Sequence, residues 1–397
     1  MKRIRDMIEL EEALVKIRDH LLLPATETIS LEDAPGRFLA TSLGADRDMP
    51  PFHKSSMDGY ACRREDLSAS LEVLETLPAG QVPSQSVGPG QCSRIMTGGQ
   101  VPEGADCVIM QEFVEVEKGE RIRFTGKDAE NHINKKGEDL RKGDVILEKG
   151  TLLGPQHLGM MAAMGIRELE VAQKVRTGIL ATGSELVEYE EVPTGAQIRN
   201  SNSVQLAAQV QRAGQEAKVL GIVRDDLDEL SSRISEAMEH CDLLLVTGGA
   251  SVGAYDLVPG VLKSLGFQLA FERVAMQPGK PVTFAHKEEK VCFGLSGNPV
   301  SSFLQFEWLV RPFLTWSSGG ELPHRRIRCR IEKPFTRRKS DRLFFLPVVL
   351  RPGGGCAPVD YHGSAHLHAL GDALGFAEMP KGKNKFDKGE EVDVRLI

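Results

Sequence analysis

The stretch Asp242-Leu-Leu-Leu-Val-Thr-Gly-Gly-Ala-Ser-Val-Gly253 joins a short, continuous apolar run to a glycine-rich loop. An apolar run of this length that ends in turn residues is typical of a strand buried on both faces of a sheet. Between Val175 and Leu314 such runs alternate with helical patterns. The alternation predicts a doubly wound parallel sheet with helices on both of its faces.

The order of these patterns defines the elements that we expect in this segment. We expect strands at residues 178–181, 217–223, 242–246 and 291–295. Helices are expected at residues 204–212, 227–240 and 256–265, and a final long helix follows the last strand. The loops that follow the strands then lie at one edge of the sheet, where open parallel sheets bind their ligands.

The sequence on either side of this segment has other patterns. Residues 7–21 place apolar side chains at three- and four-residue spacing among charged ones, which predicts an amphipathic helix. Short apolar runs between turn residues predict β structure over residues 52–144, and residues 155–165 are predicted to be helical. After Pro323 the sequence is β-like again, which predicts a small separate domain at the C-terminus.

Bulk composition argues against several classes of protein. The 397 residues exceed the size of a typical single core, so several domains are expected. The 49 basic and 56 acidic residues give a net charge of -7, which argues against nucleic-acid binding. We find no signal peptide and no apolar run of about 20 residues, so we expect a soluble protein without membrane association. The seven cysteines are scattered and form no Cys-x-x-Cys pair, which favours a cytoplasmic location.

Four loops that follow the predicted strands are polar and rich in glycine or acidic residues. They begin at Thr182, Arg224, Thr247 and Ser296. Free backbone N–H groups suit an anion in the loop of residues 247–253 and at a helix that begins at Pro299 with Asn298 as its N-cap. A single glycine-rich turn is commonly structural, since tight strand–helix turns need glycine. Four such loops at one sheet edge favour a ligand site, although the sequence has neither a Gly-x-Gly-x-x-Gly turn nor a P-loop there.

Acidic side chains occupy the same loops. Glu185, Asp225 and Asp256 each follow a predicted strand, so the fold is expected to bring them together. Carboxylates beside a phosphate-binding backbone repel a phosphate, and Mg²⁺ shared between carboxylates and phosphate removes the conflict. The alternative is that each carboxylate is a solvated turn residue. Lys280, in a stretch flanked by prolines, is either a surface charge or a contact for an anion.

A series of longer motifs runs in order along the whole chain. The longest is Pro50-Pro-Phe-His-Lys-Ser-Ser-Met-Asp-Gly-Tyr-Ala61. The others are Thr97-Gly-Gly99, Pro102-x-Gly-Ala-Asp106, Gly137-Glu-Asp139, Ala181-Thr-Gly-Ser-Glu-Leu186, Asn200-Ser-Asn-Ser203, residues 247–256, Pro278-Gly-Lys-Pro281 and Gly297-Asn-Pro-Val-Ser301. Together they resemble the motifs of the molybdenum insertase family, which includes the C-terminal domain of gephyrin. Each motif alone is weak, but the full set in this order is highly specific.

The resemblance implies a homodimeric α/β multidomain protein. Its parts are a doubly wound parallel-sheet domain like molybdopterin adenylyltransferase, a mixed β domain, a linker domain and a C-terminal β-barrel. The N-terminal helix and linker domain would span residues 1–45, completed by residues 145–174, and the β domain residues 46–144. The α/β molybdopterin-binding domain would span residues 175–322 and the barrel residues 323–397.

The implied activity is that of a transferase with molybdopterin-AMP and molybdate as substrates and Mg²⁺ as cofactor. The reaction places molybdenum on the dithiolene sulfurs and releases AMP. Molybdopterin adenylyltransferase would be the upstream partner, and molybdoenzyme apoproteins or their chaperones would be downstream partners. Two alternatives stay open: a molybdopterin adenylyltransferase, which lacks the additional domains, and a non-catalytic molybdopterin-binding scaffold.

The loops and the resemblance together indicate the functional residues. The catalytic acids would be Asp58, Asp139, Glu185, Asp225 and Asp256, of which Glu185, Asp225 and Asp256 are also the candidate metal ligands. The substrate-binding residues would be Thr247, Gly248, Gly249, Ser251, Gly297, Asn298, Pro299, Ser301, Arg273, Lys280 and Ser364. The family forms its cleft from the α/β and C-terminal domains of one subunit and the early β domain of the other. Asp58 would therefore serve the site of the partner subunit.

The sequence departs from the family pattern near these loops. Ser296 stands where the family usually has proline, and Ser184 where it often has aspartate. Gln277 replaces a frequent lysine, and Arg273 stands near a second frequent lysine. The missing lysine weakens the electrostatic attraction for molybdate, which Arg273 and Lys280 would then have to provide.

Overall fold

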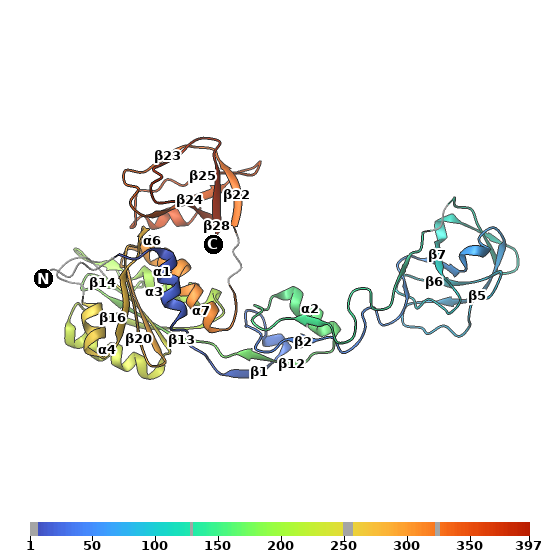
Figure 1. Cartoon of the computed structure of the whole chain (residues 1–397), viewed down its shortest axis with the longest axis horizontal. Helices are drawn as coiled ribbons and strands as arrows, with labels where there is room; N and C mark the ends of the chain where they lie inside the picture. The colour runs from blue at the N-terminus through green and yellow to red at the C-terminus, as the bar shows by residue number, and fades with distance from the viewer. Residues whose placement is uncertain (1–6, 128–129, 249–256, 322–325) are drawn as a thin grey trace. The chain divides into compact units, whose positions relative to one another are not determined.

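The computed structural model describes residues 7–127, 130–248, 257–321 and 326–397. The chain divides into two units (Figure 1). The first unit contains Met1–Thr41, Lys149–Leu158 and Glu168–Ile397, and the second contains Ser42–Glu148 and Gly159–Arg167. Among the described residues, no helix combines the length and the apolar character needed to cross a bilayer.

A six-stranded sheet forms the centre of the first unit. Its strands are, in spatial order, β16 (Glu216–Val223), β13 (Arg176–Thr182), β17 (Leu243–Thr247), β21 (Lys290–Leu295), β20 (Pro281–Lys287) and β18 (Gln268–Arg273). The first four strands are parallel, which confirms the predicted parallel sheet. The strands β20 and β18 extend it in antiparallel direction. Antiparallel neighbours need no crossover helix, so the alternation of strand and helix patterns did not reveal them.

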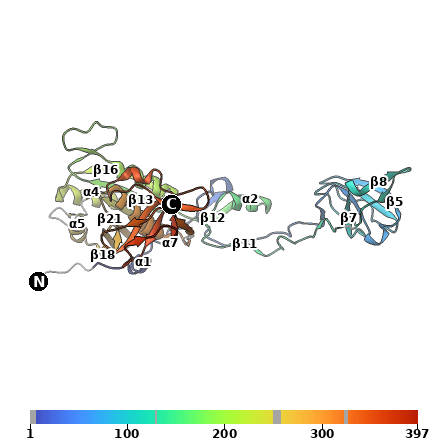
Figure 2. The ribbon, with the colours of Figure 1, turned by 90° about the horizontal axis from the view of Figure 1, so that it is seen from above.

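Alternate residues of β17 supply the cores on the two faces of this sheet. Leu243 and Leu245 pack into one core with α1 (Leu10–Arg18) and α3 (Ser201–Arg212), whereas Leu244 and Val246 pack into another. The second core includes α4 (Leu227–His240) and α5 (Val258–Ser264), and Figures 1 and 2 show the helices on both sides of the strands. Each fully buried leucine of β17 contributes about 1.5–3 kcal/mol to folding. The sheet is therefore doubly wound, as the apolar run at residues 242–246 predicts.

Side-chain caps explain where the helices of this sheet begin. The Asp226 carboxylate accepts hydrogen bonds from the N–H groups of Asp228 and Glu229, so α4 begins at Leu227 as predicted. The Asn200 side chain accepts from the Ser203 N–H, and α3 therefore begins at Ser201, three residues before the predicted start at residue 204.

The expected long helix after β21 consists of three segments. These are α6 (Pro299–Gln305), a π-helical turn η4 (Phe306–Val310) and α7 (Arg311–Ser317). The π turn contains Glu307, which is fully buried and accepts hydrogen bonds from Arg212 at 2.6 Å and Arg311 at 2.9 Å. It also contains Trp308, whose ring packs against Phe345 and Phe376 at centroid distances of 4.4 and 5.6 Å. These two phenylalanines belong to the C-terminal sheet, so the π turn connects the α/β core to that sheet.

The C-terminal sheet closes on itself. Its strands are β24 (Leu343–Leu350), β25 (Gly355–Pro358), β22 (Arg326–Ile331), β28 (Glu391–Leu396) and β26 (Gly375–Met379), and β26 pairs again with β24. This closure confirms the predicted β-barrel. A further short strand, β19 (Met276–Gln277), pairs in parallel with β24. The segment before Pro278 is therefore attached to the barrel.

The segments before the central sheet are short. The strand β1 (Thr26–Ser30) pairs in antiparallel direction with β12 (Glu168–Ala172), and the predicted helix at residues 155–165 is α2 (Pro155–Ala163). In the second unit, β2 (Leu43–Gly44) pairs with β11 (Val145–Leu147), and β3 (Lys54–Ser55) pairs with β10 (Ile133–Asn134).

A second six-stranded sheet forms the core of the second unit. Its strands are, in spatial order, β7 (Cys107–Met110), β4 (Gly59–Cys62), β6 (Gln91–Ile95), β5 (Ser70–Leu77), β9 (Arg121–Phe124) and β8 (Val114–Glu117). The pair β5 and β6 is parallel and the other pairs are antiparallel, so this is the predicted mixed β domain. Cys107, Cys62 and Cys92 lie side by side on its first three strands, and all seven cysteines of the chain are buried and free.

Candidate functional site

A cavity of about 1150 Å³ opens in the first unit at the carboxyl ends of the four parallel strands. All four predicted loops contribute to its wall. Their lining residues are Thr182, Gly183, Glu185, Asp225, Thr247, Gly248, Ser296, Gly297, Asn298, Pro299 and Ser301. The fold thus brings together loops that are far apart in the sequence, because parallel neighbouring strands end at the same edge.

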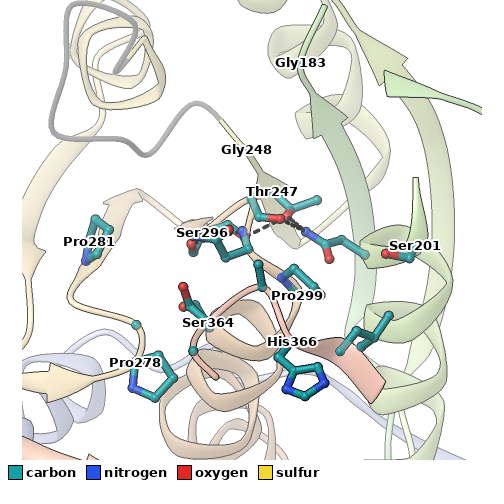
Figure 3. Close-up of a pocket in the computed structure, with 18 of the residues that line it drawn as sticks. Gly183, Ser201, Thr247, Gly248, Pro278, Pro281, Ser296, Pro299, Ser364 and His366 are labelled. Atoms are coloured by element: carbon teal, nitrogen blue, oxygen red, sulfur yellow. Dashed lines mark hydrogen bonds between the residues drawn. The ribbon is translucent and has the colours of Figure 1, made fainter. Parts of the chain in front are cut away.

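The C-terminal barrel forms another wall of this cavity. Arg342, Phe344, Tyr361 and Ser364 are among the barrel residues that line it. The Ser364 carbonyl accepts a hydrogen bond of 3.1 Å from the N–H of Val300, in the first turn of α6. This bond holds the Ser364 loop over the helix start. In Figure 3, Ser364 lies between Pro278 and Ser296.

Two of the predicted acidic residues lie in the cavity wall. The Asp225 carboxylate accepts a 3.0 Å hydrogen bond from the Thr182 hydroxyl and a 3.3 Å bond from the Ser184 N–H. Glu185 follows on the same loop, and its carboxylate occupies the space that a side chain at Gly183 would need. The carboxylate of Asp225 is therefore oriented before any ligand binds. Asp256, with Gly249 and Ser251, lies outside the described residues.

The other two predicted acids, Asp58 and Asp139, belong to the second unit and do not line this cavity. Asp58 is exposed, and its Oδ1 accepts hydrogen bonds from both the N–H and the hydroxyl of Thr97, each 2.7 Å long. These two bonds hold the pKa of the Asp58 carboxyl below its usual value. Asp139 is also exposed, and its N–H donates to the Met49 carbonyl at 2.9 Å.

Buried hydrogen bonds hold the loops after β17 and β21 against each other. The Asn202 amide donates to the Thr247 hydroxyl at 2.8 Å and to the Gly297 carbonyl at 2.9 Å. The Thr247 hydroxyl in turn donates to the Ser296 carbonyl at 3.1 Å, as Figure 3 shows. Gly248 has a φ of 100°, and an added Cβ would overlap the Thr182 carbonyl, so only glycine fits there. Asn202 was not predicted as a site residue, although its motif was recognised.

The start of α6 differs from the expectation in one respect. Asn298 occupies the N-cap position and Pro299 the first turn, as predicted, but the Asn298 side chain makes no capping hydrogen bond. The Ser364 carbonyl from the barrel accepts from the Val300 N–H instead. A side-chain cap was the simplest expectation from the sequence because the barrel contact is not visible in it.

The cationic residues of the cavity differ from those that the sequence indicates. Lys280 lines the cavity, but Arg273 does not. Arg273 is at the end of β18, and its carbonyl accepts a 3.1 Å hydrogen bond from the Ile8 N–H. Arg342 lines the cavity instead, because the pairing of β19 with β24 brings the start of the barrel beside the Lys280 loop. No local motif marks Arg342, so the sequence alone did not reveal it.

The described residues include no group of three His, Cys, Asp or Glu side chains arranged to hold a metal ion. His366 and His368 line the cavity, and the Nδ1 of His366 accepts a 3.2 Å hydrogen bond from the His362 N–H. The acidic oxygens of Glu185 and Asp225 are hard donors of the kind that Mg²⁺ prefers. Because Mg²⁺ commonly uses one or two carboxylates together with substrate phosphates, these two residues fit such an ion.

Three family models match the chain in order. They are the MoeA N-terminal region (domain I and II) over residues 8–165, a probable molybdopterin binding domain over residues 178–316 and the MoeA C-terminal region (domain IV) over residues 333–397.

Curated relatives and solved structures match over nearly the full length. The molybdopterin molybdenumtransferase of Bacillus subtilis (strain 168) is 36% identical over 411 residues, covering 99% of this chain and 95% of its own. The protein of the same name from Staphylococcus aureus (strain N315) is 33% identical over 403 residues, covering 99% and 96%. The structure of the molybdopterin biosynthesis moeA protein from Pyrococcus horikoshii OT3 covers 99% of this chain and 100% of its own, with 30% identity and a TM-score of 0.84.

Proposed function

Because this chain belongs to the MoeA family of molybdopterin molybdenumtransferases, we propose that its cavity is the place where molybdate is inserted into adenylylated molybdopterin and AMP is released. The protein is a transferase of molybdenum cofactor biosynthesis. We place the reaction in this cavity because of its lining, which has acidic residues on the loops after β13 and β16 and cationic residues beside the barrel. Acidic residues suit a magnesium ion that accompanies the phosphoanhydride, and cationic residues suit an oxyanion such as molybdate.

The acidic loops would hold the magnesium ion beside the phosphates. Glu185 and Asp225 would be its described ligands, and Asp256 would be the third candidate. A bound Mg²⁺ would neutralise charge that develops on the phosphate oxygens during cleavage. Thr182 and Ser184 hold the Asp225 carboxylate in place, so little reorganisation is needed when substrate arrives.

The nucleotide phosphates would contact the backbone of the loops after β17 and β21. Gly248 and Gly297 expose backbone without a side chain, and Asn202 holds the Thr247 and Gly297 loops together. Glycine at such positions allows a phosphate to approach the backbone closely. Gly249, Ser251, Asn298, Pro299 and Ser301 complete the proposed contacts.

The cationic side would bind molybdate. Lys280 and Arg342 line it, and the Ser364 loop lies over the same region. Arginine and lysine attract oxyanions, and arginine can donate two hydrogen bonds to one oxyanion. We assign this role to Lys280 and Arg342 rather than to Arg273, because Arg273 does not line the cavity.

The remaining proposals concern the assembly. Asp58 would act on the site of a partner subunit in a homodimer, and Asp139 would be a further catalytic acid. The three matched regions support the proposed division into parts at residues 1–45 with 145–174, 46–144, 175–322 and 323–397. The enzyme would work in the cytoplasm, receiving its substrate from a molybdopterin adenylyltransferase and delivering the cofactor to molybdoenzyme apoproteins or their chaperones.

The test is incubation of the pure protein with molybdopterin-AMP, Mg²⁺ and molybdate, with AMP release as the measurement. We expect release that depends on molybdate, and a parallel reaction with sulfate instead of molybdate is the control. Release that is equal with and without molybdate, or no release at all, contradicts insertion. A second reaction with molybdopterin and ATP distinguishes an adenylyltransferase, which would produce molybdopterin-AMP.

A further inference from the structure

Gln305 is a fully buried glutamine, 0% exposed, at the last position of α6. It does not line the cavity, yet its amide contacts two loops that do. The side-chain carbonyl accepts a 2.8 Å hydrogen bond from the Ser296 N–H. The amide nitrogen donates to the Gly279 carbonyl at 2.9 Å and to the Pro281 carbonyl at 2.6 Å.

The three partners leave only one orientation for this amide. A backbone N–H can only donate and a backbone carbonyl can only accept, so Oε1 must face Ser296 and Nε2 must face the other loop. Both amide hydrogens and one acceptor position are used. Since burial of an amide without partners is unfavourable, this complete set of partners holds the two loops at a fixed separation.

The loop that Gln305 holds carries Lys280 between Gly279 and Pro281. The Lys280 carbonyl accepts a 3.0 Å hydrogen bond from the Val274 N–H. The strand β19, directly before the loop, pairs with β24 of the barrel. Together with Gln305, these bonds fix the backbone on both sides of Lys280, so that its side chain begins from a defined place in the cavity wall.

The other partner, Ser296, is a junction of the loops after β17 and β21. Its carbonyl accepts from Thr247 at 3.1 Å, and its hydroxyl accepts from the Asn298 N–H at 3.2 Å. The bond to Gln305 uses the Ser296 N–H, which a proline at this position would lack. The loops proposed to bind phosphate are thereby connected to the loop that carries the proposed molybdate lysine.

We propose that Gln305 is a positioning residue that sets the place of Lys280 relative to the loop after β21 and thereby sets the affinity of the site for molybdate. The inference rests on the proposed function of the cavity. Gln305 touches no substrate; it acts through the carbonyls of Gly279 and Pro281 and through the Ser296 N–H.

The main variant is Gln305→Met, which keeps the volume and removes every hydrogen bond of the amide. The backbone groups that it leaves without partners let the Lys280 loop move, so the half-saturating molybdate concentration should rise roughly tenfold. The half-saturating concentration of molybdopterin-AMP should change much less, because the Asn202 amide and the Thr247 hydroxyl still hold the loop after β21. A general loss of folding would not separate the two substrates in this way.

The matched control is Gln209→Met. Gln209 is also a buried glutamine, 4% exposed, and its amide donates to Glu307 at 2.7 Å and to the Phe303 carbonyl at 3.3 Å, but it does not line the cavity and neither bond reaches a cavity loop. The variant should lower the midpoint of thermal unfolding and leave the molybdate dependence as in wild type. An equal rise in half-saturating molybdate in both variants would show that loss of packing alone causes it.

The variant Gln305→Glu adds a readout in pH. A buried carboxylate that faces two carbonyl oxygens has a raised pKa, and its protonated form can donate to one of them. The half-saturating molybdate concentration of this variant should therefore fall, relative to wild type at the same pH, when the pH is lowered from about 8.5 to about 6. A constant ratio over this range contradicts the positioning role of the amide donors.

The pair Ser296→Pro and Ser296→Ala tests the same bond from its other end. Both variants lack the hydroxyl, but only proline lacks the N–H that donates to Gln305. The proline variant should need more molybdate than the alanine variant. Equal values would overturn the proposal even if the Gln305 variants do not fold.

Calorimetry with molybdate alone separates this proposal from the proposed function. If wild type releases AMP in a molybdate-dependent way and Gln305→Met binds molybdate as tightly as wild type does, the proposed function stands and the proposed role of Gln305 is wrong. If wild type releases no AMP but binds molybdate more tightly than Gln305→Met, the function is wrong and the role of Gln305 stands. If wild type neither releases AMP nor binds molybdate, both are wrong.

Discussion

Asp225 in the first unit and Asp58 in the second unit are held by nearly the same chemistry. Each carboxylate accepts a hydrogen bond from a threonine hydroxyl and one from a backbone N–H. Both residues are exposed, but their surroundings differ: Asp225 lines a cavity together with Glu185, whereas Asp58 does not line it. A preorganised carboxylate thus becomes part of a site only where the fold adds further groups. For Asp58, the proposed homodimer would have to add them.

The largest effect is expected from Asp225→Asn. If Asp225 holds Mg²⁺ as proposed, a neutral amide cannot replace its carboxylate, so turnover should fall by roughly a hundredfold, far more than the affinity for molybdopterin-AMP. Asp256→Asn should behave alike. The measurement is single-turnover AMP release together with equilibrium binding of the nucleotide.

The neighbouring Asp226→Asn is the control for this loss. Asp226 caps α4 and does not line the cavity, and asparagine caps a helix about as well as aspartate. Its turnover should equal that of wild type. Unchanged turnover in both Asp225→Asn and Asp256→Asn would mean that the loops bind substrate without chemical use of their carboxylates.

The next largest effect is expected from removing a cation of the cavity wall, compared with removing one outside it. Lys280→Ala and Arg342→Ala each remove a charged donor, so the half-saturating molybdate concentration should rise roughly tenfold. Because one charge fewer then attracts the anion, molybdate binding by these variants should also depend less steeply on added salt than binding by wild type. Arg273→Ala, which alters a cation outside the cavity wall, should leave the molybdate dependence unchanged. A rise for Arg273→Ala alone would place the anion elsewhere.

A partial recovery of activity in mixed dimers, which is a smaller effect than the losses above, tests whether Asp58 serves a partner subunit. Dimers that combine an Asp58→Asn chain with an Asp225→Asn chain should have one doubly damaged site and one intact site. After random remixing of equal amounts, half of the dimers are mixed, so roughly a quarter of wild-type activity should return, as two-fold symmetry requires. The measurement is AMP release after joint unfolding and refolding, with refolded wild type as the reference. Recovery no better than the mean of the two parents would place both residues in the site of one subunit, or show that no such dimer forms.

The smallest effect concerns the Thr97 contacts of Asp58. Thr97→Val removes the hydroxyl donor, so the lowered pKa of the Asp58 carboxyl should rise toward its usual value in an NMR titration. Because the folded pKa lies below the unfolded value, these bonds stabilise the second unit at neutral pH, and the stabilisation is lost as the pH falls through the folded pKa. The stability difference between the variant and wild type should therefore shrink in acid. A pKa unaffected by the substitution would mean that the backbone N–H of Thr97 alone is responsible.

Local patterns predicted most of the α/β segment. The helix α4 has the predicted bounds of residues 227–240, because its capping residue and its apolar spacing both lie within the segment itself. The strands β18 and β20 were missed, and so was the π turn in the last helix. Pairing at an antiparallel edge and a π turn around the buried Glu307 depend on contacts with distant residues, which leave no periodic signal.

For the candidate site too, the features that depend on local patterns were predicted and those that depend on distant contacts were missed. The loops at Thr182, Asp225, Thr247 and Ser296 were predicted to meet, because the carboxyl ends of parallel strands share one edge of a sheet. Arg342 was missed and Arg273 was expected in its place, since nothing in the sequence near Arg342 indicates that β24 pairs with β19.

Local sequence was sufficient to identify the family, the doubly wound sheet and the loops that carry glycine and carboxylates, because each of these depends on residues close together in the chain. The tertiary structure decided which side chains share the cavity: it brought Arg342 and Ser364 from the barrel to the sheet edge and left Arg273 outside. It also decided how the Lys280 loop is held, through the amide of a buried glutamine. Pairing between strands and burial of a polar group depend on neighbours in space, and these neighbours cannot be identified from the sequence around one residue.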